Sequence, residues 1–350
     1  MSERLAPEQA DSLADIPEPA ENPRLVGHSE HAAQLAAAYR AGKLHHALLL
    51  TGPKGIGKAT FAFRLAHHLL ANPVGEHAAE SFADPDVGGS TFRQVASGAH
   101  PAVLHLTRPY DEKAKKFKGA ITVDEVRRVG RFLSLRAHDD SYRVVIVDPA
   151  DDMNRNAANA LLKSLEEPPP RALFVLISHS PGGLLPTVRS RCQVRRMSPL
   201  SEGEIERVLA GFGSALPADP EARRILVERA GGSARQAVLL AQHGGFDVTQ
   251  AADQFIAKTR RDPYDSYRLA DAVTGKDQTV TFDILNDHLL ERIAAEATRA
   301  AGNGEGRRAA RLAALWEEAS ATIRETGTYN LDKRQHVVSL LNRIGDAIAD

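Results

Sequence analysis

Short apolar runs alternate with amphipathic stretches along the chain from Pro23 to about Met197. Four of these runs are nearly continuous in apolar residues: HALLL (46–50), PAVLHL (101–106), RVVIVD (143–148) and ALFVLIS (172–178). Such runs are typical of strands buried on both faces, and their alternation with helices predicts a parallel sheet covered by helices on both sides. The pattern therefore predicts an α/β domain over residues 23–198.

The pattern changes to helices alone after Pro199. SEGEIERVL places Ser201 three residues before Glu204, and GSARQAVLLA places Ser233 three residues before Gln236. Each spacing is that of a capping box, which satisfies the free N–H groups at the start of a helix. We therefore predict a small helical lid subdomain over residues 199–245.

The rest of the chain, residues 246–350, keeps helical spacing of its apolar positions. The recurring residues are Leu285, Leu289 and Ile293, then Leu312, Leu315, Ala319 and Ile323, then Val337, Leu341, Ile344 and Ile348. They predict an all-helical third domain, with GNGEG (302–306) as a loop inside it. At the other end, residues 1–22 are acidic and have little to bury, which predicts a disordered tail.

Composition and charge narrow the class of protein. The 350 residues are 43% hydrophobic and 25% charged, which is typical of a folded, soluble protein of more than one domain. The formal net charge of −1 does not provide the broad basic surface of a protein that binds nucleic acid by bulk electrostatics. Any DNA contact must be local or shared with partners. DEKAKKFKG (111–119) is the local candidate, with a solvated loop as the simpler alternative.

Cysteine and histidine usage argue against a metal site. The single cysteine, Cys192, excludes an internal disulfide and a zinc site built from several thiolates. Neighbouring residues on a strand or helix point in different directions, so the pairs His45–His46 and His67–His68 do not present both rings to one ion. We also find no apolar segment long enough for a membrane span or a secretory signal. These features predict a cytoplasmic protein without metal.

GPKGIGKAT (52–60) follows one of the apolar runs and precedes the amphipathic stretch FAFRLAHHLL. Strand, glycine-rich turn and helix in this order predict a phosphate-binding loop. Its glycines, Gly52, Gly55 and Gly57, would let backbone N–H groups close around phosphate oxygens, and Lys58 would reach the β- and γ-phosphates. The next position, normally a Ser or Thr that binds Mg²⁺, is Ala59, and Thr60 comes one residue late.

A second motif, VVIVDPADDM (144–153), also lacks a residue that ATP hydrolysis needs. Asp148 ends a buried strand, where an aspartate that organises Mg²⁺ is expected. Pro149 follows, in the place of the glutamate that would activate water. Asp151 and Asp152 fall at the start of the next helical turn, where acids more often interact with the helix dipole. These residues predict a nucleotide site in which ATP binding is weak or absent and hydrolysis is lost.

Two further segments contain recognisable motifs. NRNAANALLKSLEEPPP (154–170) predicts a helix stopped by prolines, with Glu166 and Glu167 as solvated residues at its end. SHSPGGLLPTVRSRCQV (178–194) contains the tetrapeptide RSRC around Arg191. Together with GPKGIGKAT, VVIVDPADDM and GGSARQA, in this order over about residues 23–242, these motifs resemble the AAA+ clamp-loader ATPases of bacterial DNA polymerase III.

The resemblance assigns roles by position. It implies that Ser178 and His179 end the sensor-1 strand, that Arg235 lies on the sensor-2 helix facing the nucleotide, and that Arg191 is an arginine finger presented to a neighbouring subunit's ATP. The C-terminal helices, including TYNLDKRQ (328–335), resemble the collar that joins the loader's subunits. The implied partners are the motor (gamma/tau) and delta subunits, the sliding clamp and primed DNA.

The sequence departs from the family pattern in two places. One concerns zinc, and the other separates two possible functions. Many relatives carry a four-cysteine zinc module where residues 75–103 contain no cysteine, so we expect no zinc. Active loader ATPases have Ser or Thr at the position of Ala59 and an acid at that of Pro149. We therefore expect a replication clamp-loader subunit, part of the DNA-directed DNA polymerase holoenzyme, that donates Arg191 but has little ATPase activity of its own. The alternative is an active DNA-dependent AAA+ ATPase, either a motor subunit or a helicase-like protein.

Overall fold

The computed structural model describes residues 4–13, 16–134, 141–212, 219–242, 244–258, 260–275, 278–329 and 331–349. The chain forms two compact units, Met1–Gly213 with Val227–Gln236 and Ser214–Leu226 with Ala237–Asp350. The division runs through the predicted lid, because α7 (Glu202–Gly211) belongs to the first unit whereas α8 (Pro220–Ala230) and α9 (Ala234–Gln242) each contribute to both.

The first unit contains a five-stranded parallel sheet in the order β2-β5-β6-β1-β7. Its strands are β1 (Ala47–Thr51), β2 (Val103–Leu106), β5 (Arg143–Val147), β6 (Ala172–Ser178) and β7 (Gln193–Arg196). The four predicted apolar runs are confirmed as strands. The sequence did not predict β7, because its residues QVRR are largely polar; it is an edge strand that pairs only with β1 among the described strands.

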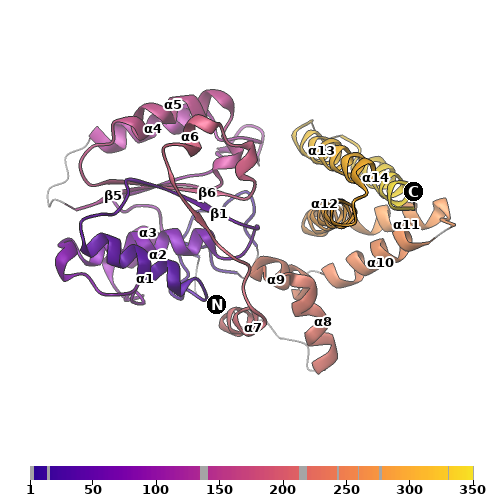
Figure 1. The fold of residues 1–350 in the computed structure, drawn as a ribbon, viewed down its shortest axis with the longest axis horizontal. Helices are drawn as coiled ribbons and strands as arrows, with labels where there is room; N and C mark the ends of the chain where they lie inside the picture. The colour runs from indigo at the N-terminus through magenta and orange to yellow at the C-terminus, as the bar shows by residue number, and fades with distance from the viewer. Residues whose placement is uncertain are drawn as a thin grey trace. The chain divides into compact units, whose positions relative to one another are not determined.

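Helices cover both faces of this sheet, as Figure 1 shows. Successive side chains of a strand point to opposite faces, so Leu48 and Leu49 of β1 enter two different cores. The core on one side includes residues of α1 (Ser29–Arg40), α2 (Lys58–Ala71) and α3 (Ser90–Ala96). The core on the other side includes residues of α4 (Val123–Ser134), α5 (Arg155–Glu166) and α6 (Pro186–Arg189). The predicted α/β architecture is confirmed.

The two capping boxes predicted in the lid lie at the starts of α7 and α9. The Ser201 backbone N–H donates to Glu204 Oε2 at 2.8 Å. At α9 the Ser233 side chain accepts from the Gln236 backbone N–H at 3.1 Å. Both helix starts were therefore correctly located from the sequence.

The basic run 111–119 lies in a small antiparallel hairpin of β3 (Tyr110–Asp111) and β4 (Lys116–Phe117). The rings of Tyr110 and Phe117 meet edge to face with their centroids 5.1 Å apart. This pairing was not predicted, because a run dominated by lysine has no apolar alternation. The lysines are thus held on a defined hairpin.

The cysteine-free region 75–103 packs against α2 through aromatic contacts. The His67 ring stacks on Phe92 with 5.6 Å between centroids, and the His68 ring lies 5.0 Å from Phe82. Arg64 is almost fully buried and donates to the backbone carbonyl of Ala83. Aromatic packing and this guanidinium therefore hold the region in place.

In the part of the chain that the structure describes, no group of three or more His, Cys, Asp or Glu residues is arranged to hold a metal ion.

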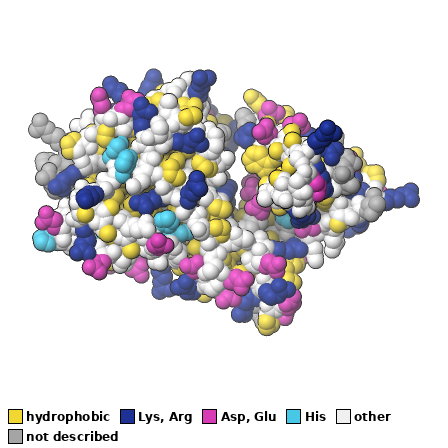
Figure 2. All heavy atoms as spheres, viewed as in Figure 1, with side chains coloured by type: hydrophobic (Ala, Val, Ile, Leu, Met, Phe, Trp, Pro, Cys, Tyr) yellow, Lys and Arg dark blue, Asp and Glu magenta, His cyan; other side chains and the backbone are white. Residues whose placement is uncertain are grey.

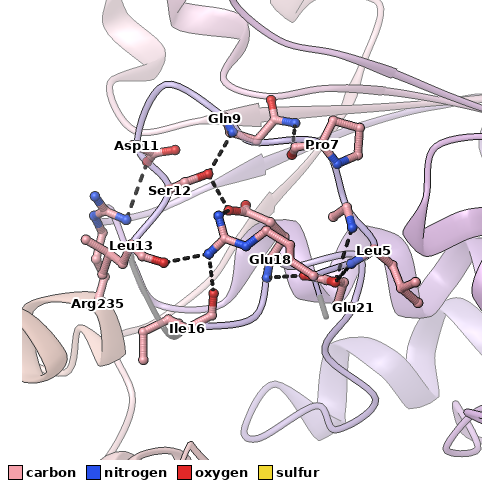
Figure 3. A network of polar contacts seen from close by, with 12 residues as sticks. Leu5, Pro7, Gln9, Asp11, Ser12, Leu13, Ile16, Glu18, Glu21 and Arg235 are labelled. Atoms are coloured by element: carbon pink, nitrogen blue, oxygen red, sulfur yellow. Dashed lines mark hydrogen bonds and ion pairs between the residues drawn. The ribbon is translucent and has the colours of Figure 1, made fainter. Parts of the chain in front are cut away.

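The N-terminal residues 4–13 and 16–22 differ from the predicted disordered tail (Figure 3). Arg4 donates to the Leu13 carbonyl at 2.6 Å, and Glu21 accepts from the Leu5 backbone N–H at 2.5 Å. Ala6, Leu13 and Ala20 are buried. Composition predicts disorder because the segment is acidic and contains few large apolar residues. Composition alone cannot show that Arg4 and Glu21 form hydrogen bonds to the backbone of this same segment.

The second unit contains the three helices that the apolar spacing predicted, α12 (Thr279–Gly302), α13 (Gly306–Tyr329) and α14 (Lys333–Ala349). It also contains α10 (Gly245–Ala257) and α11 (Pro263–Val273), for which no spacing was identified in the sequence. Every apolar position named from the sequence lies in, or packs against, one shared core. The loop between α12 and α13 coincides with GNGEG.

Charged side chains of both signs are interspersed over the surface in view, in keeping with the near-zero net charge (Figure 2). Among the helices that the structure describes, none combines the length and apolar character that a bilayer crossing requires.

Candidate functional site

The glycine-rich loop runs from the end of β1 to the first residue of α2, Lys58. Gly52, Gly55 and Gly57 all have positive φ angles, of 148°, 79° and 97°. A Cβ at Gly55 would come within 2.5 Å of Arg235 Cβ, whereas one at Gly57 would meet only His28 Nε2, at 3.9 Å. Gly55 therefore permits close packing of the start of α9, and Gly57 leaves an open approach to the N-terminus of α2.

Lys58 is buried and holds the loop together. Its Nζ donates to the carbonyl of Gly52 at 2.7 Å and to that of Pro53. Burial lowers the pKa of Lys58 to about 8, while Asp148 and Asp151 oppose the decrease. Because an ammonium group has three donors, two bonds to the loop leave one for a phosphate oxygen. The residues present thus fit a phosphate group, although part of the lysine is already engaged.

The residues that would hold Mg²⁺ depart from the expected set. Ala59 offers no oxygen, and Thr60 lies half-buried in the first turn of α2. Burial raises the pKa of Asp148 to about 7, with the Asp11 carboxylate adding to the rise and Lys58 opposing it. The position after Lys58 therefore lacks the hydroxyl that normally binds a magnesium ion.

Ser178 is directed to Asp151 at the end of β6. Its Oγ donates to Asp151 Oδ1 at 2.7 Å, and the backbone N–H groups of His179 and Ser180 donate to the other carboxylate oxygen. Burial lowers the pKa of His179 to about 3, and Lys58 adds to the decrease, so its ring is neutral. Sequence reasoning assigned Asp151 to the helix dipole and missed these bonds. One signal for these bonds is present in the sequence. Asp151 follows the predicted strand 143–148, and the next predicted strand ends at Ser178, just before His179.

Arg235 reaches the phosphate-binding loop. Its backbone N–H donates to the Gly55 carbonyl at 3.3 Å, and its Nη1 lies 3.8 Å from Asp11 Oδ2. Lys54 Nζ lies 3.9 Å from the same oxygen. The structure thus brings Arg235 together with the loop that contains Lys58. Sequence reasoning missed Lys54, which lies within the motif, and Asp11, which comes from the acidic N-terminal segment.

Arg191 lies apart from these residues, just after α6. Its Nη2 is 2.5 Å from Glu166 Oε1, and its Nη1 donates to the Thr187 carbonyl at 2.9 Å. The side chain is 34% exposed. Burial raises the pKa of the adjacent Cys192 thiol to about 11, so this thiol stays protonated. A carboxylate at the end of α5 therefore orients a guanidinium that solvent can still reach.

The histidine pairs have other partners. The rings of His45 and His46 stack with 4.5 Å between centroids, and each has a nitrogen within hydrogen-bond distance of a backbone carbonyl. The His67 and His68 rings contact different aromatic side chains. All four rings thus have structural roles in packing or backbone bonding.

A family model described as DNA polymerase III, delta subunit, matches residues 27–201. The chain is 40% identical over 189 residues to the DNA polymerase III subunit delta' of Pseudomonas aeruginosa, which covers 54% of this chain and 53% of that protein. It is 35% identical over 169 residues to subunit delta' of Escherichia coli, covering 48% and 47%. The chain thus spans about half the length of the curated relatives that it matches.

Among solved structures, a DNA polymerase III gamma subunit-related protein from Thermotoga maritima covers 90% of this chain and 99% of its own, at 18% identity and a TM-score of 0.41. The RuvB Holliday junction branch migration motor of the same organism covers 82% and 86%, at 17% identity and a TM-score of 0.39. The region that the family model matches contains the phosphate-binding loop, Asp148, Ser178 and Arg191; Arg235 lies beyond it.

Proposed function

Because the chain belongs to the DNA polymerase III delta subunit family, we propose that it acts in DNA replication as a delta-prime-type subunit of the clamp loader, which loads the sliding clamp onto primed DNA. The two curated relatives described above, both named delta', support this assignment. One observation carries the rest of the proposal: the glycines and Lys58 of the phosphate-binding loop are present in the matched region, but Ala59 and Pro149 replace the residues that hydrolysis needs.

The nucleotide site of this subunit is degenerate. Phosphoryl transfer depends on a placed Mg²⁺ and a placed water, and Ala59 and Pro149 provide neither. Two of the three donors of the Lys58 ammonium group already bond to the carbonyls of Gly52 and Pro53. ATP therefore binds weakly or not at all, and the chain does not hydrolyse it.

The catalytic contribution of the chain is made in trans through Arg191. A guanidinium is planar and permanently charged, so it can spread positive charge over the oxygens of a γ-phosphate. The ion pair with Glu166 orients Arg191 while leaving it partly exposed. The ATP that it serves belongs to a neighbouring motor (gamma/tau) subunit.

The C-terminal helices form the collar that joins this chain to the motor and delta subunits. Tyr329 and Leu331, two residues apart, are 71% and 48% exposed. They belong to the segment TYNLDKRQ, which the resemblance assigns to the collar. Burying these side chains against other subunits would stabilise the assembly.

Native mass spectrometry with cross-linking tests this function. The chain is mixed with the motor and delta subunits of the same organism, and the mass and the linked neighbours of the product are determined. We expect one copy of this chain in each complex, with cross-links from the Arg191 loop to a motor subunit. A ring made only of this chain, or no association at all, would favour the helicase-like alternative.

A further inference from the structure

The described residues of the N-terminal segment form a compact loop with its own network of hydrogen bonds (Figure 3). Glu21 accepts from the backbone N–H groups of Leu5 and Ala6, and Ser12 donates to Glu18. Arg4 donates to the Ile16 carbonyl at 2.9 Å. These bonds join the two ends of the segment, and they hold the intervening turn that carries Asp11 in a defined conformation.

The segment also packs against the rest of the first unit. Ala20 belongs to the core that contains α1 and α2, and Ala6 and Leu13 are buried. Burial of apolar surface stabilises such a contact in proportion to the area removed from water. The segment is therefore anchored at several points rather than by Asp11 alone.

Asp11 lies at the phosphate-binding loop. Its Oδ2 is 3.8 Å from Arg235 Nη1 and 3.9 Å from Lys54 Nζ, one cation from the start of α9 and one from the loop itself. Burial alone would raise the pKa of Asp11, but the positive charges of Arg235 and Lys54 outweigh it and lower the pKa. Asp11 is thus an ionised carboxylate between one cation of the glycine-rich loop and one cation of α9.

We propose that the N-terminal segment is a built-in competitor for nucleotide, with the Asp11 carboxylate occupying the position of an anionic phosphate between Lys54 and Arg235. The segment would reduce the affinity of the loop for ATP in addition to the losses at Ala59 and Pro149. Because it acts on the phosphate-binding loop, this role is independent of the partners assigned under the proposed function.

Tethering makes such competition effective. Asp11 and Lys54 belong to one chain, so the carboxylate is present at an effective concentration on the order of millimolar. ATP must displace it before its own phosphates can reach the same cations. The apparent affinity for ATP then falls in proportion to the fraction of molecules in which the loop is free.

The test measures nucleotide affinity on the full-length chain. A fluorescent ATP analogue is titrated, with and without magnesium, into wild-type protein, Asp11→Asn and the matched control Glu8→Gln. Glu8 is an exposed acid of the same segment, so its substitution removes the same charge from a different position. Since partly exposed ion pairs are weak individually, we expect Asp11→Asn to bind about tenfold more tightly and Glu8→Gln to match the wild type.

Two further variants keep the outcome decisive. Deletion of residues 1–13 should tighten binding at least as much as Asp11→Asn, because it removes the whole turn. Lys58→Ala in the Asp11→Asn background should abolish the gain, because the added affinity arises at this loop. Equal affinity for wild type, Asp11→Asn and the deletion would overturn the proposal, as would a gain that survives Lys58→Ala. Assembly with the other subunits, followed separately by native mass spectrometry, tests the proposed function and not this one.

Discussion

Arg191 and Glu166 form an ion pair with 2.5 Å between Nη2 and Oε1, joining the loop after α6 to the last residue of α5. The sequence indicated Glu166 only as a solvated residue at a helix end. The pair supports the role proposed for Arg191, because a long side chain that is already oriented loses less entropy when it binds a phosphate. On the proposed function, Glu166 would be a positioning residue for Arg191.

Arg191→Ala should leave assembly of a reconstituted loader intact but reduce its DNA- and clamp-stimulated ATPase activity. A finger arginine contributes about 10³–10⁵ to the rate at the site it serves where chemistry limits turnover. The total falls only in part, because a loader has several ATP sites. Arg191→Lys should also fail, since an ammonium keeps the charge but loses the planar fork. Steady-state phosphate release and clamp loading measure both effects.

Two substitutions act as controls for this experiment. Arg196→Ala removes an exposed arginine from the nearby strand β7 and should leave the stimulated rate unchanged. On the proposed function, Lys58→Ala should also change it little, because hydrolysis takes place on a neighbouring subunit. If Lys58→Ala abolishes loading while Arg191→Ala does not, the chain is a motor subunit.

Asp151→Ala should destabilise the first unit by about 1–3 kcal/mol, because it removes the acceptor of the Ser178 hydroxyl and of two backbone N–H groups. Urea denaturation measures the free energy of unfolding. Asp124→Ala, which removes an exposed acid from the first turn of α4, should cost less than about 1 kcal/mol. Equal effects of the two substitutions would mean that the bonds of Asp151 contribute nothing specific.

The architecture could be predicted from the sequence where burial dictates residue type. The four strands buried on both faces are nearly continuous in apolar residues, and the helices of the second unit repeat apolar residues at helical spacing. Strand β7 and the β3–β4 hairpin were missed because their side chains are largely polar and exposed. These strands are defined by backbone hydrogen bonds to a neighbouring strand, and the pattern of hydrophobic residues does not reveal such bonds.

The candidate site was predictable only in part. The glycines and Lys58 could be located because strand, loop and helix follow one another in the chain. The approach of Asp11 to Lys54 and Arg235 joins segments far apart in the sequence, and no local pattern signals it. The bonds of Asp151 were missed for the same reason, because they depend on the pairing of β5 with β6.

The isolated chain should show negligible ATP turnover. Ala59 and Pro149 replace two groups that position Mg²⁺ and water, and Ala59→Ser alone should not restore activity because no base is added. Phosphate release from the pure protein measures the rate. Turnover of about 1 s⁻¹, at the lower end of the ordinary enzyme range, would establish the active-ATPase alternative.

Deleting residues 246–350 should leave a soluble α/β fragment that no longer joins the other loader subunits, as judged by size-exclusion chromatography. The helices removed share a core of their own, so the core of the sheet is unaffected. The double substitution Tyr329→Asp and Leu331→Asp should weaken assembly without unfolding the chain, because both side chains are exposed. Normal assembly of the deleted fragment would rule out the collar assignment.

Asp148→Asn should stabilise the chain, and the gain should grow with pH. Burial raises the pKa of Asp148 from 3.8 to about 7, so between these values the folded state binds more protons than the unfolded state. The stability that wild type owes to this group therefore falls as pH rises through that window, whereas an amide never ionises. We expect a gain of roughly 1–3 kcal/mol near pH 7 and almost none near pH 4. Urea denaturation at several pH values below about 7.5 avoids the titration of Lys58, whose pKa is about 8. A gain of the same size at every pH would mean that Asp148→Asn acts through packing rather than through the charge of a buried carboxylate.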